Sequence, residues 1–215
     1  MFCRRPVEYD QLLCPSCEKD APCTDPCRCL LCKMEECVCD EAKNQFSTLA
    51  APFFYEMGAD TAIQDLKFHG NFLNARKLGF YMAKELYRRN LAGRFDVILP
   101  VPLYHKDERK RGFNQSQKLA EWVAKYTRSP LLCDLLIKTR KTQKQHELTA
   151  AERRENLKGA FQTVGAERIA GKKLLLVDDV FTTGSTLREC AAVLRRAGAD
   201  EILCLTAAKT RMVAK

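Results

Sequence analysis

The chain has 215 residues, of which 46% are hydrophobic and 29% are charged. A chain of this length buries one sizeable core and has room for a small additional module, and this composition excludes extended disorder. No run approaches the ~18 apolar residues of a membrane span, and the segment from Met1 to Gln11 lacks the apolar core of a secretory signal. We therefore expect a cytoplasmic protein without a membrane span.

The formal net charge of +9 is unevenly distributed. Residues 1–45 carry 6 basic and 9 acidic side chains, which leaves 30 basic and 18 acidic side chains in the rest of the chain. Such a basic excess favours anionic partners, either phosphorylated small molecules or nucleic acid, although a solvated basic surface has the same composition.

Most of the cysteines are concentrated near the N-terminus. Nine of the 12 lie between Cys3 and Cys39, while Cys133, Cys190 and Cys204 occur in apolar stretches, where we expect them to be buried or inert. The dense segment has too little apolar mass to fold alone, and the expected cytoplasmic location disfavours a disulfide framework. Structural zinc is therefore the preferred interpretation, and an iron–sulfur or redox site is the alternative.

The cysteine spacing leaves two ligand assignments open. Two CxxC pairs, Cys14 with Cys17 and Cys29 with Cys32, can supply four thiolates to one ion. Alternatively, Cys3 completes a site with the first pair, and a second ion takes Cys29, Cys32, Cys37 and Cys39, which leaves Cys23 and Cys27 spare. In either case we expect residues 1–45 to form a zinc-binding module and residues 46–215 to form the main domain.

Hydrophobic patterning predicts alternating strands and helices in the main domain. Strands are expected at 49–55, 96–101, 173–177 and 201–207, and helices at 59–68, 71–90, 114–126 and 186–197. The polar segment 138–158 is either a mobile loop or an exposed helix, with a helical tail at 149–157. Strand, helix and strand in this order indicate an α/β fold with a parallel sheet.

The most informative segment runs from Leu174 to Thr186. An apolar strand leads into Asp178 and Asp179, and the loop that follows contains Thr182, Thr183, Gly184, Ser185 and Thr186. Backbone amides at the start of the next helix form a phosphate cradle, and glycine permits close approach. Adjacent carboxylates can hold ribose hydroxyls and a cation. A capped turn beside an exposed acidic pair is the alternative, while Walker and Rossmann loops are excluded by residue type.

This segment resembles the phosphoribosyl pyrophosphate signature of type I phosphoribosyltransferases. Three other stretches, Leu99–Gln115, Lys67–Gly70 and Thr142–Phe161, resemble ComF-type proteins, which are associated with natural competence and with the handling of transforming DNA. The resemblance implies a phosphoribosyltransferase-like parallel sheet flanked by helices, a small N-terminal zinc-ribbon-like module, structural zinc, and magnesium bound with phosphoribosyl pyrophosphate.

The resemblance also implies roles for particular residues. Asp178 and Asp179 would contact the ribose, and residues 182–186 would hold the 5′-phosphate. Arg109 and Arg111 are the candidates for the pyrophosphate, where they would stabilise the leaving group. Four further residues are candidates for a lid and its anchor, namely Lys138, Arg140, Gln145 and Arg153.

Two departures from the family pattern affect these roles. Thr182 stands where some purine-using members place an aspartate that handles the proton of the base, and threonine cannot act in this way at neutral pH. In the family the N-terminal module often opens with a CxxC motif. Here Cys3 stands at the second cysteine of that motif and Met1 stands inside it, so either the true start of the protein lies upstream or one metal ligand is lost. All three histidines, His69, His105 and His146, are expected to be solvated, and His146 ranks first as a catalytic alternative because it lies in the proposed lid.

Two functions are compatible with the sequence. One is a phosphoribosyltransferase that moves ribose 5-phosphate to a nitrogen nucleophile. The other is a nucleotide-sensing or single-stranded-DNA-handling scaffold that partners a competence DNA translocase. Phe113, Tyr104 and Trp122 do not form an evident aromatic series among the basic residues, which weakens the second hypothesis.

Overall fold

The computed structural model describes residues 13–142 and 150–211. Its five-stranded sheet has the order β1–β7–β6–β3, with β2 also paired to β7, and each pairing is parallel. The strands of this sheet are β1 (Thr48–Ala50), β2 (Phe53–Phe54), β3 (Val97–Pro100), β6 (Lys173–Phe181) and β7 (Glu201–Lys209). A separate antiparallel pair consists of β4 (Leu136–Lys138) and β5 (Phe161–Thr163).

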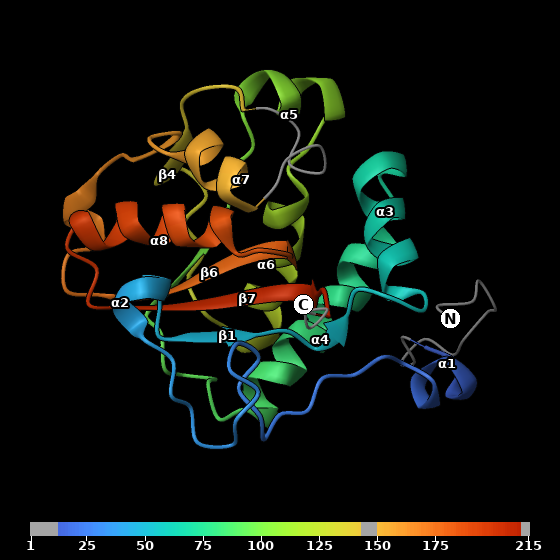
Figure 1. Ribbon diagram of the computed structural model, residues 1–215. Helices are drawn as coiled ribbons and strands as arrows, with labels where there is room; N and C mark the ends of the chain where they lie inside the picture. The colour runs from blue at the N-terminus through green and yellow to red at the C-terminus, as the bar shows by residue number, and fades with distance from the viewer. Residues whose placement is uncertain (1–12, 143–149, 212–215) are drawn as a thin grey trace.

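Helices cover both faces of the parallel sheet, with α8 on one face and α4 on the other (Figure 1). The α-helices are α1 (Pro15–Lys19), α2 (Glu41–Asn44), α3 (Ala59–His69), α4 (Phe72–Arg88), α5 (His105–Arg111), α6 (Gln115–Thr127), α7 (Ala150–Leu157) and α8 (Ser185–Arg196). A 3₁₀ turn, η2, spans Ala166–Arg168. This is the predicted α/β class.

The core divides into two clusters, one on each side of the sheet. Because side chains alternate along a strand, Leu175 and Val177 of β6 pack with the α3, α4 and α6 side, whereas Leu174 and Leu176 pack with α8. Residues 174–177 of β6 therefore form a continuous apolar run that is buried on both faces, as expected for a central parallel strand.

The predicted strand at 49–55 is interrupted at Pro52. Both parts keep one register along β7, in which Ala50 faces Leu205 and Phe53 faces Ala208. The N-terminal segment lies along the outer edge of this strand, where the backbone amide of Thr24 donates to the carbonyl of Pro52 at 2.9 Å. This pairing protects a sheet edge that would otherwise be open.

A buried ion-pair network fastens the N-terminal segment to α4. The side chain of Glu85 is fully buried and pairs with Arg89 at 2.6 Å and with Arg88 at 2.8 Å. The guanidinium of Arg89 also donates to the backbone carbonyls of Asp25, Pro26 and Arg28. One acidic residue on α4 therefore holds the cation that binds the cysteine-rich segment.

The structure differs from the expectation at α5 and at Cys133. The sequence HKDERKR forms the short helix α5, which is not among the helices predicted from the hydrophobic pattern. Segment 138–158 shares only Lys138 with strand β4, its residues 139–142 form a loop, and its predicted helical tail is α7. Among the isolated cysteines, Cys190 and Cys204 are buried as expected, but Cys133 is exposed.

Among the helices that the structure describes, none is both long enough and apolar enough to cross a membrane.

Candidate functional site

A cavity of about 540 Å³ lies at the carboxyl ends of β3 and β6. Asp178 and Asp179 line it, together with residues 101–103, which follow β3. The other lining residues include members of α3, the start of α6, and Lys138 and Phe161 of the β4–β5 pair. Crevices at the carboxyl ends of parallel strands are the usual ligand sites of open α/β sheets.

The loop after β6 has the geometry of a phosphate cradle. Gly184 adopts a φ of +78° and caps the N-terminus of α8. The hydroxyls of Thr183 and Ser185 lie 2.9 Å apart, and Arg188 donates to the carbonyl of Thr183 at 2.5 Å. Thr182 and Thr186 line the cavity. The backbone amides at the start of this twelve-residue helix therefore lie beside hydroxyl donors, an arrangement suited to an anion.

The acidic pair lies inside the carboxyl end of β6 rather than in the loop, and both side chains are buried. Oδ1 of Asp178 accepts from the Ser116 hydroxyl at 2.8 Å. Oδ2 of Asp179 accepts from the Gln115 amide at 2.8 Å and faces Lys67 Nζ, also at 2.8 Å. The alternative of an exposed acidic pair on a capped turn is therefore excluded.

Burial and the neighbouring charges both shift the pKa values of the ionisable groups in this pocket. Burial and the adjacent Asp179 raise the pKa of Asp178 from 3.8 to about 7. Burial acts against the charge of Lys67, yet the facing carboxylates of Asp179 and Asp178 raise the pKa of its ammonium. Carboxylate oxygens at this density are the donors that Mg²⁺ prefers, so Asp178 and Asp179 fit a magnesium ion.

The raised pKa of Asp178 predicts a specific pH dependence of stability. Between pH 3.8 and about 7 the folded protein binds more protons at this group than the unfolded chain, so the free energy of unfolding falls as the pH rises. We expect Asp178→Asn to raise the melting temperature at pH 8 by at least about 2 °C relative to its effect at pH 5. Thermal unfolding at the two pH values measures this difference.

Asp134→Asn is the matched control for this prediction, because Arg168 lowers the pKa of the exposed Asp134. This variant should gain no stability at pH 8. An equal effect of Asp178→Asn at both pH values would contradict the raised pKa.

The two arginines proposed for the pyrophosphate occupy different positions on α5. Arg111 is half-buried and donates to Oε1 of Gln115, the residue that holds Asp179, so it joins the pocket's hydrogen-bond network. Arg109 is exposed, and neither arginine is among the residues that line the cavity. Arg111 is therefore connected to the site only through Gln115, and Arg109 lies at the surface.

The proposed lid residues are only partly described. Lys138 lines the cavity from β4 and donates to the Thr142 hydroxyl at 2.8 Å. Arg140 instead donates to the carbonyls of Asn156 and Lys158, which ties it to the end of α7. Arg153 lies on α7. Gln145 and His146 fall outside the described residues.

The remaining histidines lie at the surface, as expected. His69 is exposed and pairs with Asp65 at 3.3 Å, and His105 is exposed at the start of α5. Neither lines the cavity.

Several pocket residues carried no assigned role in the sequence interpretation. They belong to α3, α6 and the segment before α3, and they are Lys67, Gln115, Ser116, Gln64, Phe68 and Tyr55. Lys67 and Gln115 do fall within the stretches that resemble ComF-type proteins, and that resemblance was the available signal. Their contacts with Asp179 depend on segments more than 60 positions away in the chain.

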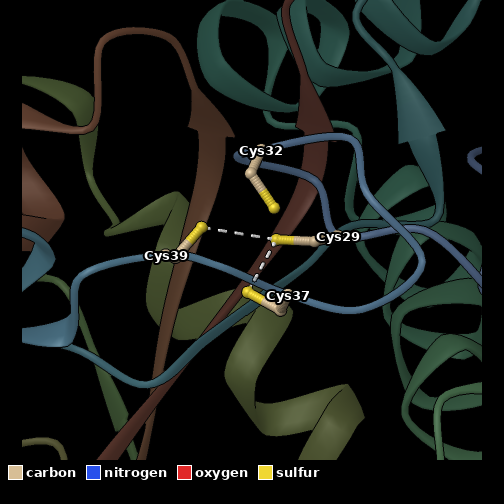
Figure 2. Close-up of side chains that lie close together, drawn as sticks. All are labelled: Cys29, Cys32, Cys37 and Cys39. Atoms are coloured by element: carbon tan, nitrogen blue, oxygen red, sulfur yellow. Dashed lines mark hydrogen bonds between the residues drawn. The ribbon is translucent and has the colours of Figure 1, made fainter.

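Four cysteine thiols gather in the N-terminal segment (Figure 2). The sulfurs of Cys29, Cys32, Cys37 and Cys39 lie within 4.8 Å of one another. Sγ of Cys29 is central in this cluster, at 3.4 Å from Cys37 and 3.6 Å from Cys39. Four thiolates bound to zinc at about 2.3 Å stand at similar separations, so the cluster fits a tetrahedral zinc ion.

The acid–base properties of the thiols support the same fit. Backbone amides of Met34 and Val38 lower the pKa of Cys32 to about 6. Burial and the neighbouring thiols raise the pKa of Cys39, and burial raises that of Cys29. Without an ion the cluster resists accumulating negative charge, and a divalent metal would offset that charge.

The positions of the cysteines distinguish between the two metal-ligand assignments. Within the described residues, Cys14 and Cys17 are not part of the four-thiol cluster and instead lie at the start of α1, where Cys17 is packed in the core. Cys3 lies outside the described residues. Cys23 and Cys27 are exposed and also lie outside the cluster. The arrangement matches the assignment of Cys29, Cys32, Cys37 and Cys39 to one ion.

The fold and the pocket define a phosphoribosyltransferase-type domain. Residues 115–212 match the family described as "Phosphoribosyl transferase domain", a segment that includes the acidic pair and the cradle after β6. Among solved structures, the chain is similar to a purine phosphoribosyltransferase from Pyrococcus horikoshii, with 19% identity, coverage of 66% of this chain and 78% of that chain, and a TM-score of 0.39.

Similarity to curated proteins specifies the family. The chain is 33% identical to DNA utilization protein YhgH of Escherichia coli O157:H7 over 94% of its own length and 87% of that protein. It is 37% identical to competence protein F of Haemophilus influenzae over 65% of its own length, an alignment that spans 63% of that protein. The chain belongs to the ComF family of competence proteins.

Proposed function

We propose that this protein binds phosphoribosyl pyrophosphate together with Mg²⁺ in the cavity at the end of β6, and that it acts in the cytoplasm in the handling of DNA taken up during competence. The observation that carries the binding proposal is a buried pair of carboxylates followed directly by a glycine-containing anion cradle. The gathered free thiols are consistent with a reducing compartment.

Different residues of the site would bind different parts of the ligand. The amides at the start of α8, with Thr183 and Ser185, would bind the 5′-phosphate, while Asp178 and Asp179 would bind the ribose hydroxyls and the magnesium ion. Magnesium, when bound, neutralises charge on the pyrophosphate. Lys67 faces Asp179, so ribose and magnesium would compete with this ion pair, and a displaced Lys67 would be available to an anionic group of the ligand.

A transfer reaction would break the bond between C1 of the ribose and the pyrophosphate and would form a bond from C1 to a nitrogen of the acceptor. Arg111, anchored through Gln115, would stabilise the departing pyrophosphate. Thr182 cannot accept the acceptor's proton. The transfer therefore requires either another base or an amine that reacts without one.

Isothermal titration tests the binding proposal directly. Phosphoribosyl pyrophosphate with Mg²⁺ is titrated into the zinc-loaded wild-type protein and into the double variant Asp178→Asn, Asp179→Asn, which preserves the size of both side chains. We expect binding by the wild type alone, competed by ribose 5-phosphate. The absence of heat and of competition in both proteins would reject the proposed ligand.

A second candidate function, a single-stranded-DNA-handling scaffold for a DNA translocase, is favoured by the surface of α3, α4 and α6. Here three aromatic rings each have a cation nearby. Lys125 lies 4.8 Å from the Trp122 ring centre, Lys118 lies 5.9 Å from Phe72, and Arg111 lies 6.0 Å from Phe68. Aromatic rings with cations beside them suit the bases and phosphates of a single strand.

The two functions are separable by mutation of this surface. Phe72→Ala with Trp122→Ala should weaken single-stranded DNA binding at least about fivefold, since each stacked base contributes about 1–3 kcal/mol. Tyr87→Ala, which removes another exposed aromatic of α4, should have no effect. Fluorescence anisotropy over a salt series measures both variants, and a wild-type affinity that is absent or independent of salt would reject the scaffold.

A further inference from the structure

A second cavity, of about 340 Å³, separates the cysteine cluster from the carboxyl end of β7. Cys29, the central thiol of the cluster, lines one side, and Lys209, the last residue of β7, lines another. Lys33, in the turn directly after Cys32, also borders the cavity. Two lysines from distant parts of the chain therefore share one cavity with a thiol of the four-cysteine cluster.

Lys209 is buried in an unusual way for a lysine. Its exposed fraction is 3%, and its ammonium donates to the carbonyl of Thr210 at 3.4 Å. In residues 13–142 and 150–211, no carboxylate pairs with either Lys209 or Lys33. Burial and the nearby Lys33 lower the pKa of Lys209. A buried cation without an anion is costly, so its retention requires an explanation.

The two arginines that line the same cavity, unlike the lysines, are paired with carboxylates. Arg28 pairs with Asp25 at 3.6 Å and with Glu35 at 3.8 Å, and Arg211 pairs with Glu56 at 2.7 Å. Their charges are compensated by carboxylates. The charges of Lys33 and Lys209 are therefore the uncompensated ones around this cavity in the described part of the chain.

A divalent ion held by four thiolates carries a net charge of −2, because four negative sulfurs exceed the charge of the ion by two. Lys33 and Lys209 carry the equal and opposite charge. We propose that Lys209, together with Lys33, offsets the negative charge of a metal–tetrathiolate centre formed by Cys29, Cys32, Cys37 and Cys39. Both lysines act through the thiolates, as groups that surround a metal site commonly do.

The proposal makes Lys209 unfavourable in the metal-free protein and favourable in the metal-loaded protein. Replacing Lys209 with methionine removes a buried, unpaired charge while it preserves apolar volume. The metal-free variant should therefore melt at the same temperature as the metal-free wild type or at a higher one. The same substitution should weaken metal binding. A lysine that only stabilises the fold would lower the melting temperature and leave the zinc affinity unchanged.

The test is competition for Zn²⁺ between the full chain and a chromophoric chelator, with melting temperatures measured on the metal-free proteins. We expect Lys209→Met to bind zinc about 10–100-fold more weakly, and Lys209→Arg to remain close to the wild type. Lys33→Met, an exposed site, should weaken binding in the same direction without a folding defect. Lys43→Met removes a lysine whose side chain is 84% exposed in the same segment and should change nothing.

Two results would overturn the proposal. One is wild-type zinc affinity in both Lys209→Met and Lys33→Met. The other is stabilisation of the metal-free wild type, but not of Lys209→Met, by inorganic phosphate while the zinc affinity of the variant stays unchanged. In that case the cavity would be an anion site and the lysines would have no role at the metal centre.

Discussion

Replacing Glu85 with alanine is expected to destabilise the protein by about 3–5 kcal/mol, because removing one partner of a buried ion pair leaves the other charge uncompensated. The Glu85 side chain is fully buried, and that of Arg89 is 7% exposed. Loss of Glu85 also frees the guanidinium that binds the carbonyls of Asp25 and Arg28. Urea unfolding of the zinc-loaded protein gives the free energy of unfolding.

Glu56→Ala is the control for this effect. Glu56 pairs with Arg211 at 2.7 Å, but their side chains are 32% and 59% exposed. A solvated pair of this kind contributes about 0–1 kcal/mol, so the control should lose little stability. Similar losses in Glu85→Ala and Glu56→Ala would mean that the network on α4 does not hold the N-terminal segment.

The second large effect is expected at Gly184. A Cβ atom there would lie 2.5 Å from Cζ of Phe181 and 2.9 Å from Nη1 of Arg188, and the φ of +78° is unfavourable for a side chain. Gly184→Ala must therefore displace the loop that forms the anion cradle. We expect at least about 100-fold weaker binding of phosphoribosyl pyrophosphate, since the amides at the start of α8 lose their alignment. Isothermal titration measures this loss.

Gly93→Ala separates the steric effect from backbone strain. Gly93 has a nearly identical φ of +79°, but no atom lies within 4 Å of the added Cβ, and the residue does not line the cavity. The control should lose some stability and keep its ligand affinity. Equal affinity in Gly184→Ala and the wild type would show that the loop after β6 does not contact the ligand.

The sequence was most informative where the site is local. The apolar run of β6, the acidic pair and the cradle are consecutive, so periodicity and residue type were sufficient to locate them. The correction at Asp178 and Asp179 is small: the strand continues to Phe181, and the acids are buried at its end. Local patterning does not specify where such a strand stops.

The rest of the pocket depends on tertiary structure. Lys67 and Gln115 reach Asp179 only because α3 and α6 pack beside the end of β6, and no local pattern encodes that contact. Helix α5 contains no apolar residue, so no hydrophobic period marked it. The sequence did not group Phe72 of α4 with Trp122 of α6, because the two residues are 50 positions apart.

The two cysteine assignments could not be separated from spacing alone, since both use regular CxxC pairs. The fold distinguishes them, because the chain returns after Cys32 and brings Cys37 and Cys39 to Cys29. The partition into modules 1–45 and 46–215 stays a prediction. Leu13 and Leu30 of the N-terminal segment pack within the two core clusters, which makes independent folding of that segment a question for truncation experiments.

Hydrogen exchange, measured with and without phosphoribosyl pyrophosphate and Mg²⁺, tests the central claim most directly. If the cavity at the carboxyl end of the sheet holds this ligand, amide exchange will slow in residues 182–187 and 101–104 and will remain unchanged in residues 29–39. Unchanged exchange in residues 182–187 at ligand concentrations that saturate the calorimetric signal would contradict the claim, because the bound phosphate would then lie elsewhere.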